Sequence, residues 1–297
     1  MRFGIMAMQI DALVPSDLPL EKVMEHVGSF DHSALVRLLA DLRFDLVELG
    51  GDLSLFMPQT YAPESIDRLQ ALKDERGLSY TVHLPLWSVE PSTPLTPVRE
   101  GSVQALVEII QATRPLAPER YVCHATGALA AEFYRMRLPE LARTLLLQQF
   151  QNGARESIKT ILSETGIDSR LLAIETIEFP FDLTHSLAEE LDLSICFDTG
   201  HVLVGFSGPV DFLETLEGCL PRLGEVHLHD GPWQGLERKI GYGKDHQTLG
   251  QGDLDLPRFL DRLHQANYSG PIVFELRTDQ ALASLEVIRS MRPQYLP

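Results

Sequence analysis

Residues 171–201 read LLAIETIEFPFDLTHSLAEELDLSICFDTGH, and this stretch contains the pattern that decides the fold. A short apolar run ends at Glu175, a segment of helical period covers Leu183–Leu191, and a second apolar run ends at Phe197, directly before Asp198. A strand, a helix and a second strand in this order form a βαβ unit with parallel strands. The stretch therefore predicts a parallel sheet with a carboxylate at the end of each of two strands.

The same alternation continues in both directions along the chain and gives eight units. We expect strands at Arg2–Ala7, Leu46–Leu49, Tyr80–His83, Arg120–His124, Leu172–Glu175, Ser194–Phe197, Gly224–His227 and Pro271–Glu275. We expect helices at Asp31–Leu42, Pro63–Arg76, Val98–Thr113, Pro139–Thr165, Leu183–Leu191, Val210–Leu220, Leu256–Ala266 and Thr278–Met291. A chain of 297 residues, 44% hydrophobic, has the usual size of one α/β barrel. The predicted fold is α/β, a single (β/α)8 barrel that spans residues 1–297 as one domain.

The composition indicates which classes of partner and which cellular compartment are expected for the chain. A formal net charge of -17 disfavours nucleic acid as a partner, because non-specific binding to phosphates depends on Lys and Arg. No apolar stretch approaches the roughly 20 residues that span a bilayer, and the N-terminus is more typical of a strand than of a signal peptide. Cys123, Cys196 and Cys219 form no CxxC pair, which is typical of reduced core residues. We expect a cytoplasmic protein without a membrane partner.

Residues that can bind a metal ion follow most of the expected strands. Besides the opening stretch, the strings are SYTVHLPL (79–86), RYVCHATG (120–127), GEVHLHDG (224–231) and PIVFELRT (271–278). The candidate ligands are His83, His124, Glu175, Asp198, His201, His227, His246 and Glu275. Strand ends in a closed barrel face one volume, where several carboxylates repel each other unless a cation or a proton holds them. Imidazole and carboxylate ligands suit zinc, manganese, iron or cobalt, so we expect a divalent transition-metal site.

Three long connections follow expected strands, and such loops build the active site in barrels of this kind. They are Gln9–Phe30, Leu84–Pro97 with Trp87, and Leu228–Asp255 with Trp233. Loops of more than about 12 residues without regular structure are usually functional or disordered. We expect the two tryptophans to contact a bulky ligand as parts of a lid. A contact between the subunits of a homodimer is the alternative.

Several other polar residues allow two interpretations. His229 and Asp230 either orient a ligand or belong to an ordinary polar loop. Arg277 lies two residues after Glu275, on the same side of the strand, and either binds a phosphate or pairs with acidic residues of the rim. We expect four histidines on the surface, namely His26, His32, His185 and His264.

These residues resemble the xylose isomerase-like barrel superfamily, which includes sugar isomerases, sugar epimerases and zinc-dependent abasic-site endonucleases. The likeness covers nearly the whole chain. The ligand set of the epimerases corresponds to Glu175, Asp198, His227 and Glu275. The larger set of the endonucleases adds His83, His124, His201 and His246, all present in this chain.

The larger set implies two ions, most consistent with zinc, manganese or iron, and Glu175 as the bridge between them. By this resemblance one ion is held by His83, His124 and Glu175, and its neighbour by Glu175, Asp198, His227 and Glu275. The endonucleases have an Asp two residues before the loop histidine, where this chain has Lys244. A third ion at His201 and His246 therefore depends on whether Asp245, one place later, substitutes for that Asp.

A ligand set of this size fits phosphoester hydrolysis better than isomerisation, because paired ions can activate water and neutralise the phosphoryl oxygens. The strings IETIEFPF (174–181) and SICFDTGHVL (194–203) look like those of the cobamide-remodelling phosphodiesterases. The most particular match is IExxExPF, with Glu175, Glu178, Pro180 and Phe181. This resemblance implies hydrolysis of the nucleotide loop of a cobamide at the phosphoribosyl link.

Other functions remain open from the sequence. A sugar or sugar-phosphate isomerase or epimerase would use Glu175 and Glu275 as an acid–base pair around one ion, with His201 and Arg277 polarising the substrate. DNA repair at abasic sites, which the acidic charge disfavours, and a barrel that only binds a ligand are further alternatives. The candidate catalytic residues are Glu175, Glu275 and His201. The candidate substrate-binding residues are Arg277, Trp87 and Trp233.

Overall fold

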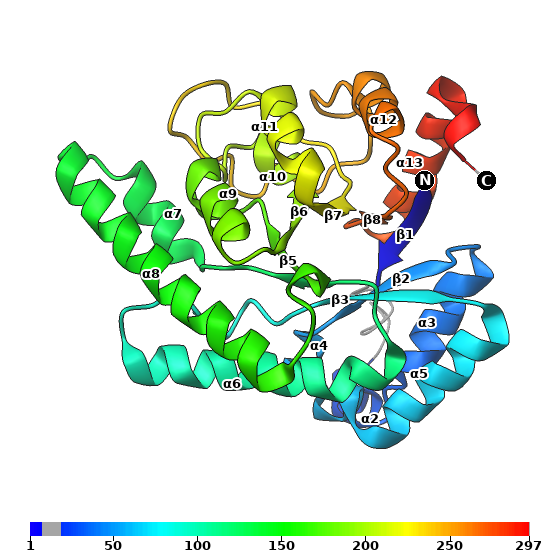
Figure 1. Ribbon diagram of the computed structural model, residues 1–297. Helices are drawn as coiled ribbons and strands as arrows, with labels where there is room; N and C mark the ends of the chain where they lie inside the picture. Colours follow the sequence, from blue (N-terminus) through cyan, green and yellow to red (C-terminus); the bar gives the residue numbers. More distant parts are fainter. Residues whose placement is uncertain (8–18, 297) are drawn as a thin grey trace.

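The computed structural model describes residues 1–7 and 19–296. Eight parallel strands in these residues close into a barrel in the order in which they occur along the chain. They are β1 (Arg2–Met6), β2 (Leu46–Gly50), β3 (Ser79–His83), β4 (Tyr121–Cys123), β5 (Leu172–Glu175), β6 (Ser194–Asp198), β7 (Leu223–His227) and β8 (Pro271–Phe274). Strand β1 pairs with both β2 and β8, which closes the barrel and places the two ends of the chain near each other (Figure 1). The predicted (β/α)8 fold is confirmed.

Helices connect the strands and cover the outside of the barrel (Figure 1). The α-helices are α2 (Leu20–Gly28), α3 (His32–Asp41), α4 (Leu53–Phe56), α5 (Pro63–Arg76), α6 (Thr96–Thr113), α7 (Ala128–Arg135), α8 (Glu140–Thr165), α9 (Phe181–Glu190), α10 (Thr199–Leu203), α11 (Phe212–Cys219), α12 (Leu256–Gln265) and α13 (Thr278–Met291). The 3-10 turns are η1 (Pro58–Tyr61), η2 (Arg114–Leu116), η3 (Ser169–Leu171), η4 (Leu220–Arg222) and η5 (Pro293–Tyr295). None of the described helices is long and apolar enough to span a bilayer.

Four short helices lie where the sequence predicted irregular chain. Helix α2 lies in the first long connection, whose residues 8–18 are outside the described part of the chain. Helices α4 and α7 follow β2 and β4. Helix α10 follows β6, and the Asp198 carboxylate caps it by accepting a hydrogen bond from the His201 N–H at 2.6 Å. This cap turns the chain back at the strand end and keeps His201 beside Asp198.

Apolar side chains fill most of the space between strands and helices, and all three cysteines lie buried there without a disulfide, as expected. Inside the barrel, however, several polar side chains are also completely buried, and three of them lie beneath the candidate ligands. Glu48 lies on β2, Thr81 on β3 and Glu225 on β7. The Thr81 hydroxyl donates to Glu225 Oε1 at 2.9 Å. Since β3 and β7 are not neighbours, this contact crosses the barrel interior, and a polar layer lies beneath the mouth.

Candidate metal centre

The structure brings the eight candidate ligands together at the carboxyl ends of the strands. Alternate residues of a strand point to the same face, so one inward-facing residue at each strand end reaches the mouth. Two groups have ligand atoms within 4.8 Å of one another and share Glu175. The first contains His83, His124 and Glu175, and the second contains Glu175, Asp198, His227 and Glu275. His201 and His246 belong to a further group with His229 and Glu275.

Glu175 lies at the centre of this arrangement and is almost fully buried. Its Oε2 atom is 3.3 Å from His83 Nε2 and 3.1 Å from His124 Nε2. Its Oε1 atom accepts a hydrogen bond from His201 Nδ1 at 2.8 Å. Burial by itself would raise the pKa of Glu175, but the surrounding histidines, His124 and His227 above all, hold it well below its usual range. Oε2 therefore faces histidines of both ligand groups, since His227 Nδ1 is 3.7 Å from the same oxygen, while Oε1 contacts His201 on α10.

His227 faces three carboxylates with one ring nitrogen. His227 Nδ1 is 3.7 Å from Glu175 Oε2, 3.7 Å from Asp198 Oδ2 and 3.7 Å from Glu275 Oε2. The same nitrogen is buried and has no hydrogen-bond partner. The ion pairs that the three carboxylates form within the described residues are all to histidines. A buried cluster of acids around an unsatisfied imidazole nitrogen fits a divalent cation.

Asp245 lies between the two remaining candidate ligands. Its Oδ2 atom is 3.3 Å from His201 Nε2 and 3.4 Å from His246 Nδ1. His246 has a φ of 55°, in the left-handed region, and this turn of the backbone directs the neighbouring carboxylate inward. Burial opposes the charged form of His246, but contacts with Asp245 and Glu275 raise its pKa to about 10. Asp245 therefore contacts both His201 and His246 from the position after Lys244.

His229 and Asp230 have separate tasks. The His229 ring donates from Nε2 to Asp198 Oδ2 at 2.8 Å and accepts the His246 backbone N–H on Nδ1 at 2.9 Å. Its ring also stacks on that of His246, with centroids 4.2 Å apart. Asp230 accepts backbone N–H groups of the loop after β7, from Gly250 at 2.8 Å and Leu254 at 3.0 Å. His229 thus orients two candidate ligands, whereas Asp230 holds the loop in place.

Two buried carboxylates behind the candidate ligands had no role assigned from the sequence, and Glu48 was not identified there at all. Glu48 Oε2 is 3.3 Å from His227 Nε2, on the opposite side of the ring from the three acids. Glu178 Oε2 is 3.6 Å from His124 Nδ1, and Glu178 has a φ of 64°. The resemblance to IExxExPF singled out Glu178 without giving it a task. For Glu48, the available signal was an acidic residue inside an otherwise apolar parallel strand.

The predicted substrate-binding residues lie on exposed parts of the rim. The Trp87 and Trp233 side chains are 52% and 50% exposed. Aspartates hold their backbones: the Trp87 N–H donates to Asp52 at 3.3 Å, and the Trp233 N–H donates to Asp253 at 2.9 Å. Trp87 also makes an edge contact with the exposed Phe56 ring, at 6.1 Å between centroids. The two loops are therefore anchored by their backbones while their aromatic side chains face solvent.

Arg277 does not contact the candidate ligands in the described contacts. Its guanidinium makes a two-point ion pair with Asp279, at 2.7 and 3.1 Å, and the side chain is 64% exposed. This contact agrees with the interpretation as a salt bridge at the rim. A phosphate contact would require the side chain to exchange Asp279 for the ligand.

The prediction that His32 lies on the surface is wrong. Its side chain is 1% exposed, packs edge-on against Tyr61 at 5.7 Å, and has no hydrogen-bond partner on either ring nitrogen. Burial lowers the pKa of His32 to about 4, so the ring is neutral. His264 is exposed, as expected, and His185 is half-buried with Nε2 near Gly218 O at 3.2 Å. The side chain of His26 lies outside the described part.

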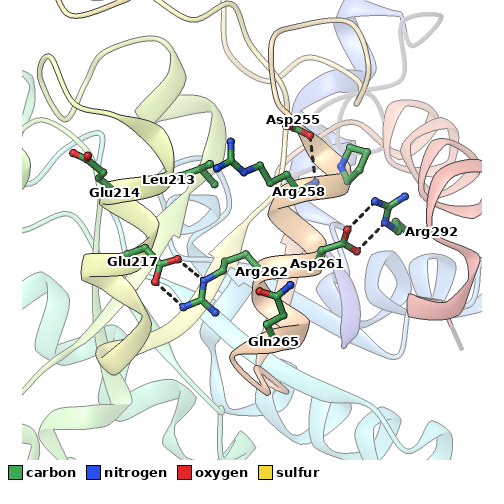
Figure 2. Close-up of a pocket in the computed structure, with 10 residues that line it drawn as sticks. Leu213, Glu214, Glu217, Asp255, Arg258, Asp261, Arg262, Gln265 and Arg292 are labelled. Atoms are coloured by element: carbon green, nitrogen blue, oxygen red, sulfur yellow. Dashed lines mark hydrogen bonds and ion pairs between the residues drawn. The ribbon is translucent and has the colours of Figure 1, made fainter.

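A surface hollow of about 590 Å³ lies away from the mouth, between α11 and α12 on the outside of the barrel (Figure 2). Four of its charged side chains form two ion pairs. Glu217 makes a two-point ion pair with Arg262, and Asp261 accepts from Arg292 at 2.7 and 2.8 Å (Figure 2). Their charge is thus neutralised within the protein, and the hollow lacks the clustered histidines of the mouth.

Comparisons with known proteins agree with the barrel fold. The family model described as xylose isomerase-like TIM barrel matches residues 36–293. An uncharacterized protein of Methanocaldococcus jannaschii is 24% identical over 301 residues, which cover 97% of this chain and 88% of that protein.

Solved structures with the same fold include proteins of two kinds. A D-tagatose 3-epimerase-like protein has a TM-score of 0.69 at 22% identity, covering 99% of this chain and 98% of that one. The 3-keto-D-glucoside 4-epimerase of E. coli has a TM-score of 0.64 at 18% identity, covering 99% of both chains. Endonuclease IV from Thermus thermophilus has a TM-score of 0.66 at 20% identity, covering 99% of this chain and 100% of that one. At these identities the likeness establishes the fold.

Proposed function

The chain belongs to the xylose isomerase-like TIM-barrel family, and on that premise we propose that it is a metal-dependent phosphodiesterase acting on the nucleotide loop of a cobamide. The observation that carries the proposal is the pair of ligand groups that share Glu175. A single ion would be satisfied by the second group, and His83 and His124 would then have no task. Two groups with a common carboxylate fit two neighbouring divalent ions.

The protein would contribute the negative charge of the ligands, their orientation and their burial from solvent. Bound divalent ions would supply Lewis acidity, which activates water and neutralises the phosphoryl oxygens. Glu175 and Glu275 would provide the negative charge that holds such ions; Glu175 is the last residue of β5, and Glu275 directly follows β8. His201 donates to Glu175 at 2.8 Å, which restrains the carboxylate. Within the described residues, the ion pairs of these two acids are to histidines, which leaves their charge available to cations.

Asp245 supports a third ion position beside the pair. It lies within 3.4 Å of a ring nitrogen of both His201 and His246. An aspartate and two histidines form a ligand set that suits zinc. We therefore include Asp245 among the proposed ligands, with occupancy of this position secondary to that of the two-ion site.

The choice of a cobamide rests on the sequence strings and on the rim. Two IExxExPF residues lie at the centre, with Glu175 as the shared ligand and Glu178 behind His124. The rim carries exposed apolar side chains, among them Phe56, Trp87 and Trp233. A large amphipathic corrinoid would cover such side chains, whereas a small sugar would leave most of them in water.

Incubation of the zinc- or manganese-loaded protein with a complete cobamide tests the proposal. Hydrolysis adds one water across the phosphodiester and should release the lower-ligand riboside and a phosphorylated corrinoid, detected by mass spectrometry. EDTA should abolish the reaction. Duplex DNA with an abasic site should stay intact under the same conditions, because the net charge of -17 opposes its binding. Nicking of that DNA with an unchanged cobamide would contradict the proposal.

Substitution of the rim tryptophans separates binding from chemistry. Trp87→Ala and Trp233→Ala should raise the KM for the cobamide and leave the hydrolysis rate of a small phosphodiester nearly unchanged. The reason is that both side chains are exposed on the rim and make no recorded contact with the candidate ligands. Equal loss with both substrates would contradict the assignment of a lid contact.

A sugar isomerase or epimerase is the second candidate, and one observation favours it. Glu175, Asp198, His227 and Glu275 form a complete group for one ion, with two glutamates that could exchange protons with a carbon acid. The structural similarity to a D-tagatose 3-epimerase-like protein and to 3-keto-D-glucoside 4-epimerase agrees with it. Interconversion of a ketose with its epimer, together with an inert cobamide, would replace the phosphodiesterase proposal.

A further inference from the structure

We propose that Glu48 is a positioning residue that orients His227 for metal binding. Glu48 is a buried carboxylate on β2 that contacts the Nε2 atom of His227. The other ring nitrogen of His227, Nδ1, faces Glu175, Asp198 and Glu275. The inference rests on the proposed metal centre. It is independent of the substrate and of the reaction, because it concerns only how one ligand is held.

The contact crosses the interior of the barrel. Glu48 Oε1 and Oε2 lie 3.4 and 3.3 Å from His227 Nε2, and both side chains are 0% exposed. Strands β2 and β7 are not neighbours in the sheet, so the approach cannot result from strand pairing. The two side chains meet because both point inward, and the surrounding strands prevent either from turning to solvent.

The geometry selects one tautomer of His227. A neutral imidazole carries its proton on one ring nitrogen and a lone pair on the other. A carboxylate at Nε2 favours the proton there, which leaves the Nδ1 lone pair directed at the three acids of the mouth. A histidine that binds a metal ion usually donates its other N–H in this way, and the acceptor increases the basicity of the ligand. His227 Nδ1 is thus ready for a cation.

A structural role alone does not account for a glutamate at this place. Burying a carboxylate without a cationic partner is costly, and Glu225 is a second buried acid within 4.8 Å. Leu46 lies two residues earlier on the same face of β2, and a leucine in place of Glu48 would fill similar volume without that cost. The recorded hydrogen bonds and ion pairs of the Glu48 side chain are to His227 alone. Its position is explained by the histidine that it orients.

The other two histidines of the shared groups are held in comparable ways. His83 Nδ1 is 2.9 Å from the carbonyl oxygen of Leu84, and His124 Nδ1 is 3.6 Å from Glu178. Each of the three therefore presents one nitrogen to the centre and the other to an acceptor. Glu48 is the acceptor for His227, the histidine whose other ring nitrogen faces three carboxylates.

A matched set of variants tests the role of Glu48. Metal-free wild-type protein, Glu48→Gln, Glu48→Leu and Glu225→Gln are titrated with Co²⁺, followed by calorimetry and by the visible spectrum of the bound ion. Glu48→Leu should weaken one class of Co²⁺ site by about 10- to 100-fold. Glu48→Gln should weaken it less, because the amide oxygen can still accept the Nε2 proton. Glu225→Gln is the control and should bind like wild type, since its amide oxygen still accepts from Thr81.

Thermal unfolding separates positioning from folding. The metal-free Glu48→Leu protein should unfold at a somewhat lower temperature than wild type, because His227 loses a buried partner. The rise in Tm on adding Co²⁺ should be smaller than in wild type, because weaker binding stabilises the fold less. A merely structural role would lower the Tm of both forms equally and leave the rise unchanged.

Three results would overturn the inference. Unchanged Co²⁺ affinity in Glu48→Leu would overturn it while leaving the proposed metal centre intact. Loss of one ion equivalent in both Glu48→Leu and Glu225→Gln would point instead to a separate ion held between the two buried glutamates and His227. Absence of Co²⁺ binding by the wild-type protein would overturn the proposed metal centre and this inference with it.

Discussion

The mouth of the barrel and the hollow between α11 and α12 are both rich in acidic side chains, but the two regions neutralise them differently. In the hollow, Glu217 and Asp261 each pair with an arginine and lie on the surface (Figure 2). In the mouth, Glu175 is buried and contacts only histidines in the recorded ion pairs. Arginines therefore neutralise Glu217 and Asp261 in the hollow, whereas the acids of the mouth keep a negative charge that a metal cation can neutralise.

This difference explains why the hollow between α11 and α12 is not the candidate site. Exposed ion pairs are screened by water and contribute little to stability or to chemistry. Burying an acid without a Lys or Arg partner reduces the stability of the fold. Such acids are typical of sites that bind a metal ion or transfer a proton. Burial and the type of partner, rather than the size of a depression, identify the functional region of this barrel.

The largest expected effect comes from neutralising the shared carboxylate of the mouth. Glu175→Gln keeps the volume of the side chain but removes the charge that both ligand groups share, so activity should fall by orders of magnitude. The fold should persist, because the amide can still contact the surrounding imidazoles. Steady-state kinetics and a thermal unfolding curve measure the two quantities.

His264→Gln is the matched control for that variant. His264 is exposed on α12 and packs against Tyr295, with centroids 5.1 Å apart. Its substitution should leave activity at the wild-type level. Similar activities of the Glu175 and His264 variants would contradict the central place of Glu175 and remove the contrast between the two regions.

An intermediate effect is expected in the pH dependence of the metal-free protein. Burial alone would lower the pKa of His124, but the charges of Glu175 and Glu178 raise it to about 10. His246 is likewise raised to about 10. Since the unfolded value is about 6.5, this stabilisation is fully present below that pH and is lost as the pH rises through about 10.

The Tm of metal-free protein should therefore fall as the pH is raised from 7 to 10. Protein loaded with zinc should show a smaller fall over the same range, because the ions take the place of the protons between the acids and the histidines. Circular dichroism melts with and without chelator would measure both slopes. Equal changes of Tm with pH in the two samples would show that the acids of the mouth are neutralised without metal, like those of the hollow.

The smallest effect is expected in the hollow. Glu217→Gln removes one member of an exposed pair with Arg262 and should change neither activity nor the content of bound metal. Its Tm should stay within the error of the measurement. A large loss of activity would show that the hollow takes part in function and that the comparison of the two regions is wrong.

The sequence predicted the strands and the eight candidate ligands because these signals are local. A ligand such as Glu175 directly follows an apolar run, so its place at the barrel mouth follows from the strand end and the closure of the sheet. His201 was found in the same way, since a DxxH turn keeps it beside Asp198.

Other features depend on contacts between distant segments and could not be predicted. Glu48 contacts His227 across 179 positions of the sequence, and only the closed barrel brings them together. His32 is buried by Tyr61, which the local helix pattern did not indicate. Asp245 faces His201 and His246 because His246 adopts a left-handed backbone conformation that its residue type does not dictate. Long-range packing and backbone turns thus determined what the sequence left open.

The number of bound metal ions tests the central claim most directly. Protein purified without any chelator is analysed for zinc, manganese, iron and cobalt, and the total is divided by the concentration of the chain. Two ligand groups that share Glu175 predict at least two ions per chain. One ion or none in fully homogeneous protein would contradict the paired centre and shift the proposal to a one-ion isomerase or a barrel without metal chemistry.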